Sequence, residues 1–322
     1  MKTSAAEFTK KLFLEAFEIS TALFRIMVPL IVVVKILQET GGIAFLGNLL
    51  APVMQIVGLP GSMGLVWATA ILANNYAGAV VFISLMGACP VTVAQTTIIA
   101  LMMLVAHNLP VELRIAQKAG ARFRFMFLVR VCGAFLFGWV AFRIYQLGGW
   151  FQGLNTAKWV PPIEESSLSA WAVSQLRELI LIFFIILGLV LLLKILARVG
   201  ITEIMIRFLN PILKLLGIGP SASTITIIGM TLGIAYGGGL IIKEAASGRL
   251  DQRDVLFSLT LMGLSHSLIE DTLLMAILGA DIFGVLWGRL ILTLLTMFFL
   301  VKLVTHLPEP VLSRFVVREP KM

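Results

Sequence analysis

Long apolar segments recur along this chain, and they restrict the folds open to it more than any single motif does. Residues 179–196, for example, contain one charged side chain, Lys194. Hydrophobic residues make up 59% of the sequence and charged residues 13%, and the mean hydropathy is +1.00. A soluble domain carries about 25% charged residues. We therefore predict an all-α polytopic membrane protein, because a helix satisfies its own backbone hydrogen bonds inside lipid.

The second half of the chain repeats the first half in a nearly constant register. Proline, glycine, histidine and arginine recur in the same order, which chance alignment of apolar sequences does not readily produce. The clearest pairs are Pro52 with Pro211, Gly58 with Gly217, His107 with His266, and Arg130 with Arg289, while Tyr76 meets Tyr236 after one extra residue. We predict one repeat over residues 21–146 and another over 174–303, with an amphipathic helix at 1–20, a linker at 147–173 and a tail at 304–322.

Each repeat contains the same predicted series of segments. An apolar helix is followed by a shorter proline-containing segment suited to the membrane interface, by an apolar stretch interrupted near its middle, and by two more apolar helices. The interruptions are Asn74-Asn75 in the first repeat and Tyr236-Gly237-Gly238-Gly239 in the second. The segments are residues 22–37, 43–57, 62–87, 91–109 and 125–141, and then 179–196, 201–216, 221–246, 255–268 and 282–301. Residues 1–20 mix charged and apolar side chains as a helix on the membrane surface does.

The positions of the basic residues favour one topology. If both interrupted stretches turn back as re-entrant hairpins and the N-terminus is inside, the basic loops at 114–124 and 243–253 lie in the cytoplasm. That arrangement satisfies the positive-inside rule, whereas full spans would place the 114–124 loop outside. Equivalent loops of the two repeats differ in charge character, which indicates opposite sides of the membrane. We predict an inverted-topology repeat of about six spanning helices and two hairpins. The protein would lie in the cell membrane with both termini cytoplasmic.

The most polar stretch within apolar sequence is Gly263–Asp271, and Ala106–Glu112 is its weaker counterpart. Ionisable residues inside membrane segments usually face a partner, a cavity or a substrate path. On a continuous helix, His266 would share a face with Glu270, and Ser267 with Asp271, because each pair is four residues apart. Alternatively, these side chains pair with one another or cap a helix end at the membrane surface. The predicted topology supports this alternative, since it places Glu270 and Asp271 towards the outer face.

The interrupted stretches and the polar segments that follow them resemble the Gate, or nucleoside recognition, domain family. The resemblance runs from about Phe24 to Leu303 as two Gate-like copies, and it rests on Leu50-Ala51-Pro52, Asn74–Gly78, Asn210-Pro211 and Gly263–Thr272. This family is similar in pattern to concentrative nucleoside transporters, to the membrane region of the ferrous-iron permease and to spore maturation membrane proteins. The chain differs from the iron permease because no Gly-x-x-x-x-Gly-Lys-Ser/Thr sequence for GTP binding occurs.

The resemblance and the repeat together imply a secondary transporter or permease for a small polar, nucleoside-like solute or for a cation. Such transporters bind their substrates near the midplane, where discontinuous helices meet. The expected substrate-binding residues are Asn74, Asn75, Tyr76, His107, Tyr236, Gly237, Gly238, Ser265, His266, Ser267, Glu270 and Asp271. A divalent metal would use His266 with Glu270 or Asp271. No resident cofactor is expected, and coupling to Na⁺ or H⁺ stays open.

Structural roles compete with these functional ones. Asn74 and Asn75 would satisfy backbone groups at a turn, and the glycines after Tyr236 permit close backbone approach. We expect Arg130 and Arg289 to be structural, either neutralising carboxylates in the core or reaching to an interface.

The sequence gives less support to two other classes of function. Enzymatic activity is not expected, because Gly263-x-Ser265-x-Ser267 is not a nucleophile elbow and no His-Glu-x-x-His sequence occurs. The net charge of +8 fits anionic lipid headgroups, and nothing indicates nucleic-acid binding. The expected partners are the lipid bilayer and a small solute or ion, with a homodimer left open. The rival function is a non-transporting membrane protein that acts through a partner, as spore maturation proteins suggest.

Overall fold

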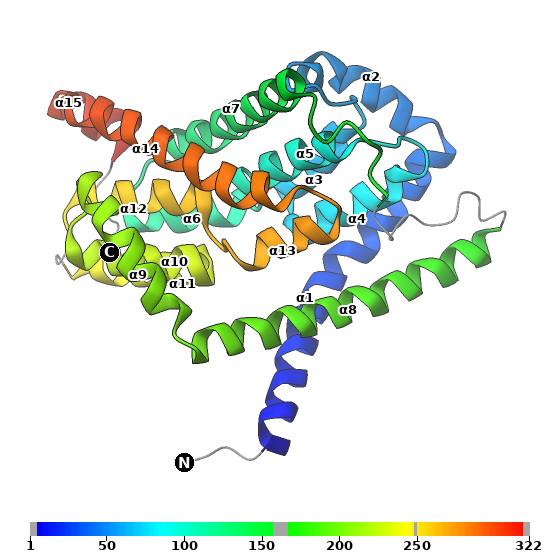
Figure 1. Ribbon diagram of the computed structural model, residues 1–322, viewed down its shortest axis with the longest axis horizontal. Coiled ribbons are helices and arrows are strands. Elements are labelled where there is room, and N and C mark those ends of the chain that lie inside the picture. The colour runs from blue at the N-terminus through cyan, green and yellow to red at the C-terminus, as the bar shows by residue number, and fades with distance from the viewer. Residues whose placement is uncertain (1–4, 157–166, 248–249, 318–322) are drawn as a thin grey trace.

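The computed structural model describes residues 5–156, 167–247 and 250–317 (Figure 1), and this part of the chain contains helices but no β-strand. The first half contains α1 (Ala5–Glu39), α2 (Gly42–Gln55), α3 (Met63–Leu72), α4 (Asn75–Met86), α5 (Val93–Val105), α6 (Leu109–Ala119) and α7 (Phe123–Gly148). The second half contains α8 (Leu168–Arg198), α9 (Ile201–Leu215), α10 (Pro220–Leu232), α11 (Ile234–Ala246), α12 (Gln252–Ser265), α13 (Glu270–Ile277), the π-helical turn η1 (Gly284–Gly288) and α14 (Arg289–Thr305). The short α15 (Glu309–Val311) and η2 (Leu312–Val316) follow.

Four helical stretches in the described residues are long and apolar enough to cross a membrane, and a fifth is reached if a pair bent by 91° at the α1–α2 junction counts as one span. They are Val93–Ala119, Phe123–Gly148, Leu168–Leu196 and Gly284–Thr305. This confirms an all-α membrane protein with several spanning helices. The count is lower than the predicted six. One reason is that α12 and α13, with 14 and 8 residues, are each too short to cross alone.

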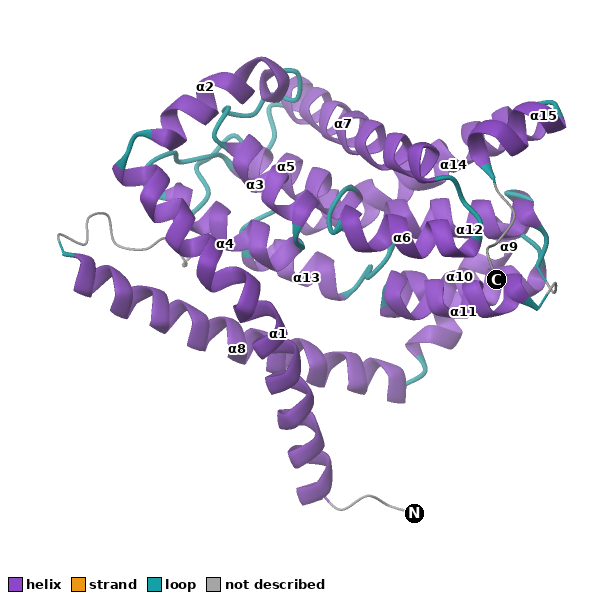
Figure 2. Ribbon diagram, turned by 180° about the vertical axis from the view of Figure 1, so that it is seen from behind, coloured by secondary structure: helices purple, strands orange, loops and turns teal. Residues whose placement is uncertain are grey.

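The interrupted stretches form helical hairpins, as the sequence predicted. The first is α3–α4 and the second is α10–α11, whose arms lie side by side (Figure 2). Glycines make the close approach possible: a Cβ atom added at Gly237 in α11 would lie 2.5 Å from the Cα atom of Gly229 in α10. In the first hairpin, a Cβ atom at Gly78 would lie 3.0 Å from the Cβ atom of Ala70. Each hairpin therefore packs as a unit.

The N-terminal segment differs from the prediction. Residues 5–20 were expected as a separate surface helix, but they continue into the first apolar helix as the single 35-residue helix α1. Helix α1 crosses α8 (Figure 1), with Phe13 stacked edge-on against Phe183 and Glu15 in an ion pair with Lys194. Apolar residues from both helices close this contact, so that packing against α8 holds the amphipathic segment in line with the span.

Candidate functional site

Two broken helices meet in the centre of the molecule. The α5–α6 break contains His107, and the α12–α13 break contains His266. Asn108 and Ser267, which follow the two histidines, both have a left-handed φ of 48°. The predicted segment 255–268 therefore ends earlier than expected. Helix α12 ends at Ser265, and His266 is extended, so the condition of a continuous helix is not met and His266 and Glu270 do not share a helical face.

The hairpins hold both breaks open. The backbone N–H of Asn108 donates to the carbonyl of Ala70 in α3 at 2.9 Å, and that of Leu268 donates to the carbonyl of Met230 in α10 at 2.9 Å. A broken helix exposes backbone groups that have no partner within the helix. Here, the first arm of each hairpin supplies one missing partner, so the hairpin and the break of the same repeat are mechanically joined.

Two buried arginines satisfy the carbonyls left at the ends of α5 and α12. Arg130 donates to the carbonyls of Val105 and His107, and Arg289 donates to those of Leu264 and Leu104. Their relative exposures are 1% and 0%, so neither side chain reaches an interface. The C-terminal end of a helix carries partial negative charge, which stabilises a nearby cation. The expected structural role of the two arginines thus takes the form of helix capping within the core.

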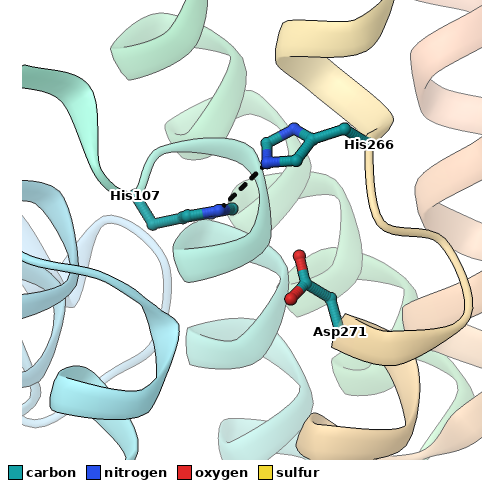
Figure 3. Close-up of side chains that lie close together, drawn as sticks. All are labelled: His107, His266 and Asp271. Atoms are coloured by element: carbon teal, nitrogen blue, oxygen red, sulfur yellow. Dashed lines mark hydrogen bonds between the residues drawn. The ribbon is translucent and has the colours of Figure 1, made fainter. Parts of the chain in front are cut away.

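The two histidines face each other across the repeats (Figure 3). The Nδ1 atom of His107 lies 2.9 Å from the carbonyl oxygen of Met103, and that of His266 lies 2.8 Å from the carbonyl oxygen of Met262. A carbonyl only accepts, so each Nδ1 carries a proton. The two Nε2 atoms lie 3.1 Å apart. Each Nε2 offers a lone pair when its ring is neutral, so a proton or another cation can join the two rings in this buried site.

Glu112 joins the histidine pair. Its Oε1 atom lies 3.3 Å from Nε2 of His266 and 3.5 Å from Nε2 of His107, while its Oε2 atom accepts a bond from Arg130. The side chain is 3% exposed. The sequence analysis did not select Glu112 as a site residue. The signal was present, because Glu112 occupies the repeat position of Asp271, at the same 159-residue separation that joins the two histidines.

Asp271 lies close to both histidines (Figure 3). One ligand atom each from His107, His266 and Asp271 lie within 4.8 Å of one another. The Oδ2 atom of Asp271 is buried and has no hydrogen-bond partner among the described residues. The same is true of the Asn75 amide, which lies near this carboxylate. In the described residues as a whole, further buried polar atoms without a partner belong to Ser20, Gln175, Asn210, Ser265, Thr272, Arg289 and Thr293. Since buried polar groups are normally satisfied, the site around Asp271 can bind a further polar or charged group.

The comparisons with known proteins fit this architecture. Residues 21–122 match the Gate family, which is described as nucleoside recognition. The matched part runs from α1 into the loop after α6 and includes Asn75, His107 and Glu112. The chain is also similar to the uncharacterized membrane protein YvoD of Bacillus subtilis (strain 168), with 27% identity over 310 residues, 92% of this chain and 95% of the relative. No solved structure matches it.

The structure brings only some of the predicted site residues together. Asn75, His107, His266 and Asp271 gather in the centre, and Ser265 is buried at the end of α12. Asn74 is committed to capping α4, because its Oδ1 accepts the N–H of Ala77 at 2.9 Å. Glu270 accepts the hydroxyl of Tyr76 at 2.8 Å. Asp271 is 6% exposed, so its side chain is buried within the protein.

The remaining predicted residues lie at the second hairpin. Gly237 packs against Gly229, and Ser267 lies close to the hairpin tip, 3.0 Å from the position of a Cβ atom added at Gly233. The backbones of Tyr236 and Gly238 are part of α11, but the side chain of Tyr236 lies outside the described part of the chain. Gly237 therefore has the close-packing role that the sequence gives as the alternative. The match to the Gate family over residues 21–122, the apolar helices and the membrane relative support a transporter-like membrane protein.

Proposed function

We propose that this protein is a secondary transporter that carries a small cation across the cell membrane. The central cluster, defined as His107, His266, Glu112 and Asp271, would bind the ion. One observation carries this proposal: two imidazole Nε2 atoms lie 3.1 Å apart, beside the Oε1 atom of Glu112. With both rings neutral, the facing lone pairs and the carboxylate repel one another, and a positive charge between them converts that repulsion into attraction. Neither a neutral nor an anionic solute would do this.

A nucleoside-like solute has less support from the same geometry. A drug-sized ligand needs a cleft of about 300–1,000 Å³ lined by a few convergent polar groups. In the central cluster the histidine and glutamate atoms lie within 3.5 Å of one another. Asn74, expected to contact a base or sugar, is used to cap α4. The unpartnered Asn75 amide is the feature that keeps a polar solute as the second candidate.

The hairpins supply a route to alternating access. Each hairpin is tied to the break of its own repeat, through Ala70 and Asn108 in one case and Met230 and Leu268 in the other. Each also reaches the other repeat, because α4 bonds to α13 through Tyr76 and Glu270 and α11 packs along α6. If one hairpin withdraws while the other stays in place, the cluster opens to one side only. Transporters with discontinuous helices at the midplane work in this way.

Transport by the reconstituted protein tests the proposal. The full chain is placed in liposomes, and uptake of H⁺, Na⁺, Zn²⁺ and uridine is followed in parallel. We expect saturable uptake of one of the cations, abolished by His107→Ala and by His266→Ala. Saturable uptake of uridine in place of any cation would replace the proposal with the nucleoside-like one. Absence of uptake for every compound would favour the partner-dependent membrane protein.

The third histidine of the chain provides a matched control. His306 also places its Nδ1 atom near the carbonyl four residues earlier, that of Lys302 at 2.6 Å, but it is exposed and lies far from the cluster in sequence. His306→Ala removes an imidazole of similar local geometry. We expect its uptake to equal that of the unmodified protein. Equal losses in all three variants would indicate a general effect on folding and would contradict the proposed site.

A further inference from the structure

The three closest atoms of the central cluster form a triangle of suitable size for a metal ion. Its sides are 3.1 Å between the two Nε2 atoms, 3.3 Å from His266 to Glu112 and 3.5 Å from His107 to Glu112. A tetrahedral ion with bonds of about 2.0–2.1 Å keeps its ligand atoms roughly 3.3–3.4 Å apart. The triangle therefore matches one face of such a tetrahedron, in side lengths and in ligand types.

We propose that the central cluster binds a divalent first-row transition-metal ion of the zinc class, with His107 Nε2, His266 Nε2 and Glu112 Oε1 as three ligands and Asp271 as the fourth. This inference rests on the proposed function, because it names the class of cation that would be carried. Two imidazole nitrogens favour Zn²⁺, Co²⁺, Ni²⁺ or Fe²⁺ over Mg²⁺ and Ca²⁺, which prefer oxygen ligands. The predicted ligand set of His266 with Glu270 or Asp271 is revised, because Glu270 is engaged by Tyr76.

The groups behind the three ligands are arranged as in metal sites. Metal-binding histidines usually donate their other ring N–H to a carbonyl or carboxylate, which fixes the tautomer and the ring orientation. Both histidines do this, through Met103 and Met262. The carboxylate of Glu112 is likewise held by Arg130 on the oxygen that does not face the histidines. Both repeats supply these supports, so the site needs the two halves of the chain together.

Asp271 supplies the fourth ligand atom of the proposed metal site. Its ligand oxygen lies within 4.8 Å of both histidine nitrogens, and its Oδ2 atom has no hydrogen-bond partner among the described residues. An unpaired buried carboxylate is costly unless a cation or a donor compensates it. Movement of this side chain towards the histidines closes the coordination shell, and movement away opens it. A ligand that can leave in this way suits a site that must release its ion.

Metal binding by the detergent-purified full chain tests the inference directly. The protein is stripped with a chelator and titrated with Zn²⁺ and, separately, with Co²⁺, whose visible spectrum reports tetrahedral geometry. We expect one tight equivalent per chain and an intense tetrahedral Co²⁺ spectrum. His107→Ala and His266→Ala should each abolish both signals, Glu112→Gln should weaken binding at least about 10-fold, and His306→Ala should change neither. Unchanged stoichiometry in the histidine variants would overturn the site.

X-ray absorption on the unmodified protein tests the same metal site if the variants do not fold. Two imidazoles in the first shell of bound Zn²⁺ are expected, and none or one would overturn it. The transport assay separates this result from the proposed function. Metal binding without uptake of any cation would overturn the transporter and leave the metal site standing. Uptake of H⁺ or Na⁺ by a protein that binds no Zn²⁺ or Co²⁺ would overturn the metal site and leave the transporter standing.

Discussion

Glu112 and Asp271 occupy equivalent positions in the two repeats, but the structure uses them differently. Glu112 forms an ion pair with Arg130 and faces both histidines, whereas Asp271 leaves its Oδ2 atom unbonded within the described residues. Arg289, the counterpart of Arg130, bonds to the carbonyls of Leu264 and Leu104. The internal symmetry therefore gives one carboxylate that is held by an arginine and one whose Oδ2 atom has no hydrogen bond within the described residues.

This asymmetry predicts different effects of neutralising the two carboxylates. Glu112→Gln leaves a buried guanidinium without its counter-ion, and removing one partner of a buried pair costs about 3–5 kcal/mol. Asp271→Asn removes a buried charge that has no hydrogen bond on Oδ2, so stability should hold or rise. Thermal unfolding in detergent, without added metal, measures both. Equal losses in the two variants would contradict the assigned roles.

Much of this arrangement could be predicted from the sequence, because the repeat itself is a long-range constraint. The pairing of His107 with His266 and the two hairpins follow from matched positions and from the Asn74-Asn75 and Gly237–Gly239 interruptions. The position of the break at His266 could not be predicted in the same way. It depends on a carbonyl from α10 and a guanidinium from α14, which lie far outside the local window. The predicted segment therefore ran on to residue 268, whereas tertiary contacts accompany an end of α12 at Ser265.

Glu112 was overlooked for a related reason. Its stretch, Ala106–Glu112, is the weaker copy of the polar segment, and Pro110 and Val111 interrupt the pattern of hydroxyls and carboxylates seen in the stronger copy. Transferring Asp271 to its repeat position would have identified Glu112. The sequence could not decide whether Arg130 and Arg289 are buried, because an arginine in an apolar helix fits a membrane interface as well as a protein core.

The second hairpin predicts a strong difference between neighbouring glycines. A Cβ atom at Gly237 would lie 2.5 Å from the Cα of Gly229 and 2.8 Å from the sulfur of Met262, whereas one at Gly239 would meet nothing within 4 Å. Gly237→Ala should separate the hairpin arms and cost about 1–3 kcal/mol or more. Gly239→Ala should be neutral or stabilise the helix by roughly 0.5–1 kcal/mol. Melting temperatures of the two variants check this, and a tolerated Gly237→Ala would refute the close packing.

The hydrogen bond from Tyr76 to Glu270 predicts energetic coupling between the repeats. A bond to a charged group contributes about 1.5–3 kcal/mol, and this one joins the first hairpin to α13. Tyr76→Phe and Glu270→Gln should each lower the melting temperature. In a double-mutant cycle the combined loss should be smaller than the sum, with a coupling of roughly 0.5–3 kcal/mol. Additive losses would show that the bond does not form in the membrane protein in detergent.

The predicted topology can be checked at loops that the structure joins. Asn155 bonds to the carbonyl of Leu278 at 2.7 Å, Arg122 bonds to that of Val317 at 3.1 Å, and Asp254 accepts the N–H of Gly219 at 2.7 Å. In the predicted topology, each bond connects two loops on one side of the membrane: outside for Asn155 and Leu278, inside for the other two pairs. An inverted repeat with re-entrant hairpins is compatible with all three contacts.

Labelling of single cysteines in intact cells shows on which side of the membrane each of these loops lies. In a background with Cys89→Ser and Cys132→Ser, an impermeant maleimide should label Thr156→Cys directly. It should label Lys118→Cys and Gln252→Cys only after permeabilisation, because both exposed positions lie in loops with an excess of basic residues. Labelling of Lys118→Cys and Gln252→Cys from opposite sides would mean that α10 and α11 together cross the membrane once, as one broken span. The central cluster would then lack its second re-entrant hairpin, and access would require a different movement from the one proposed.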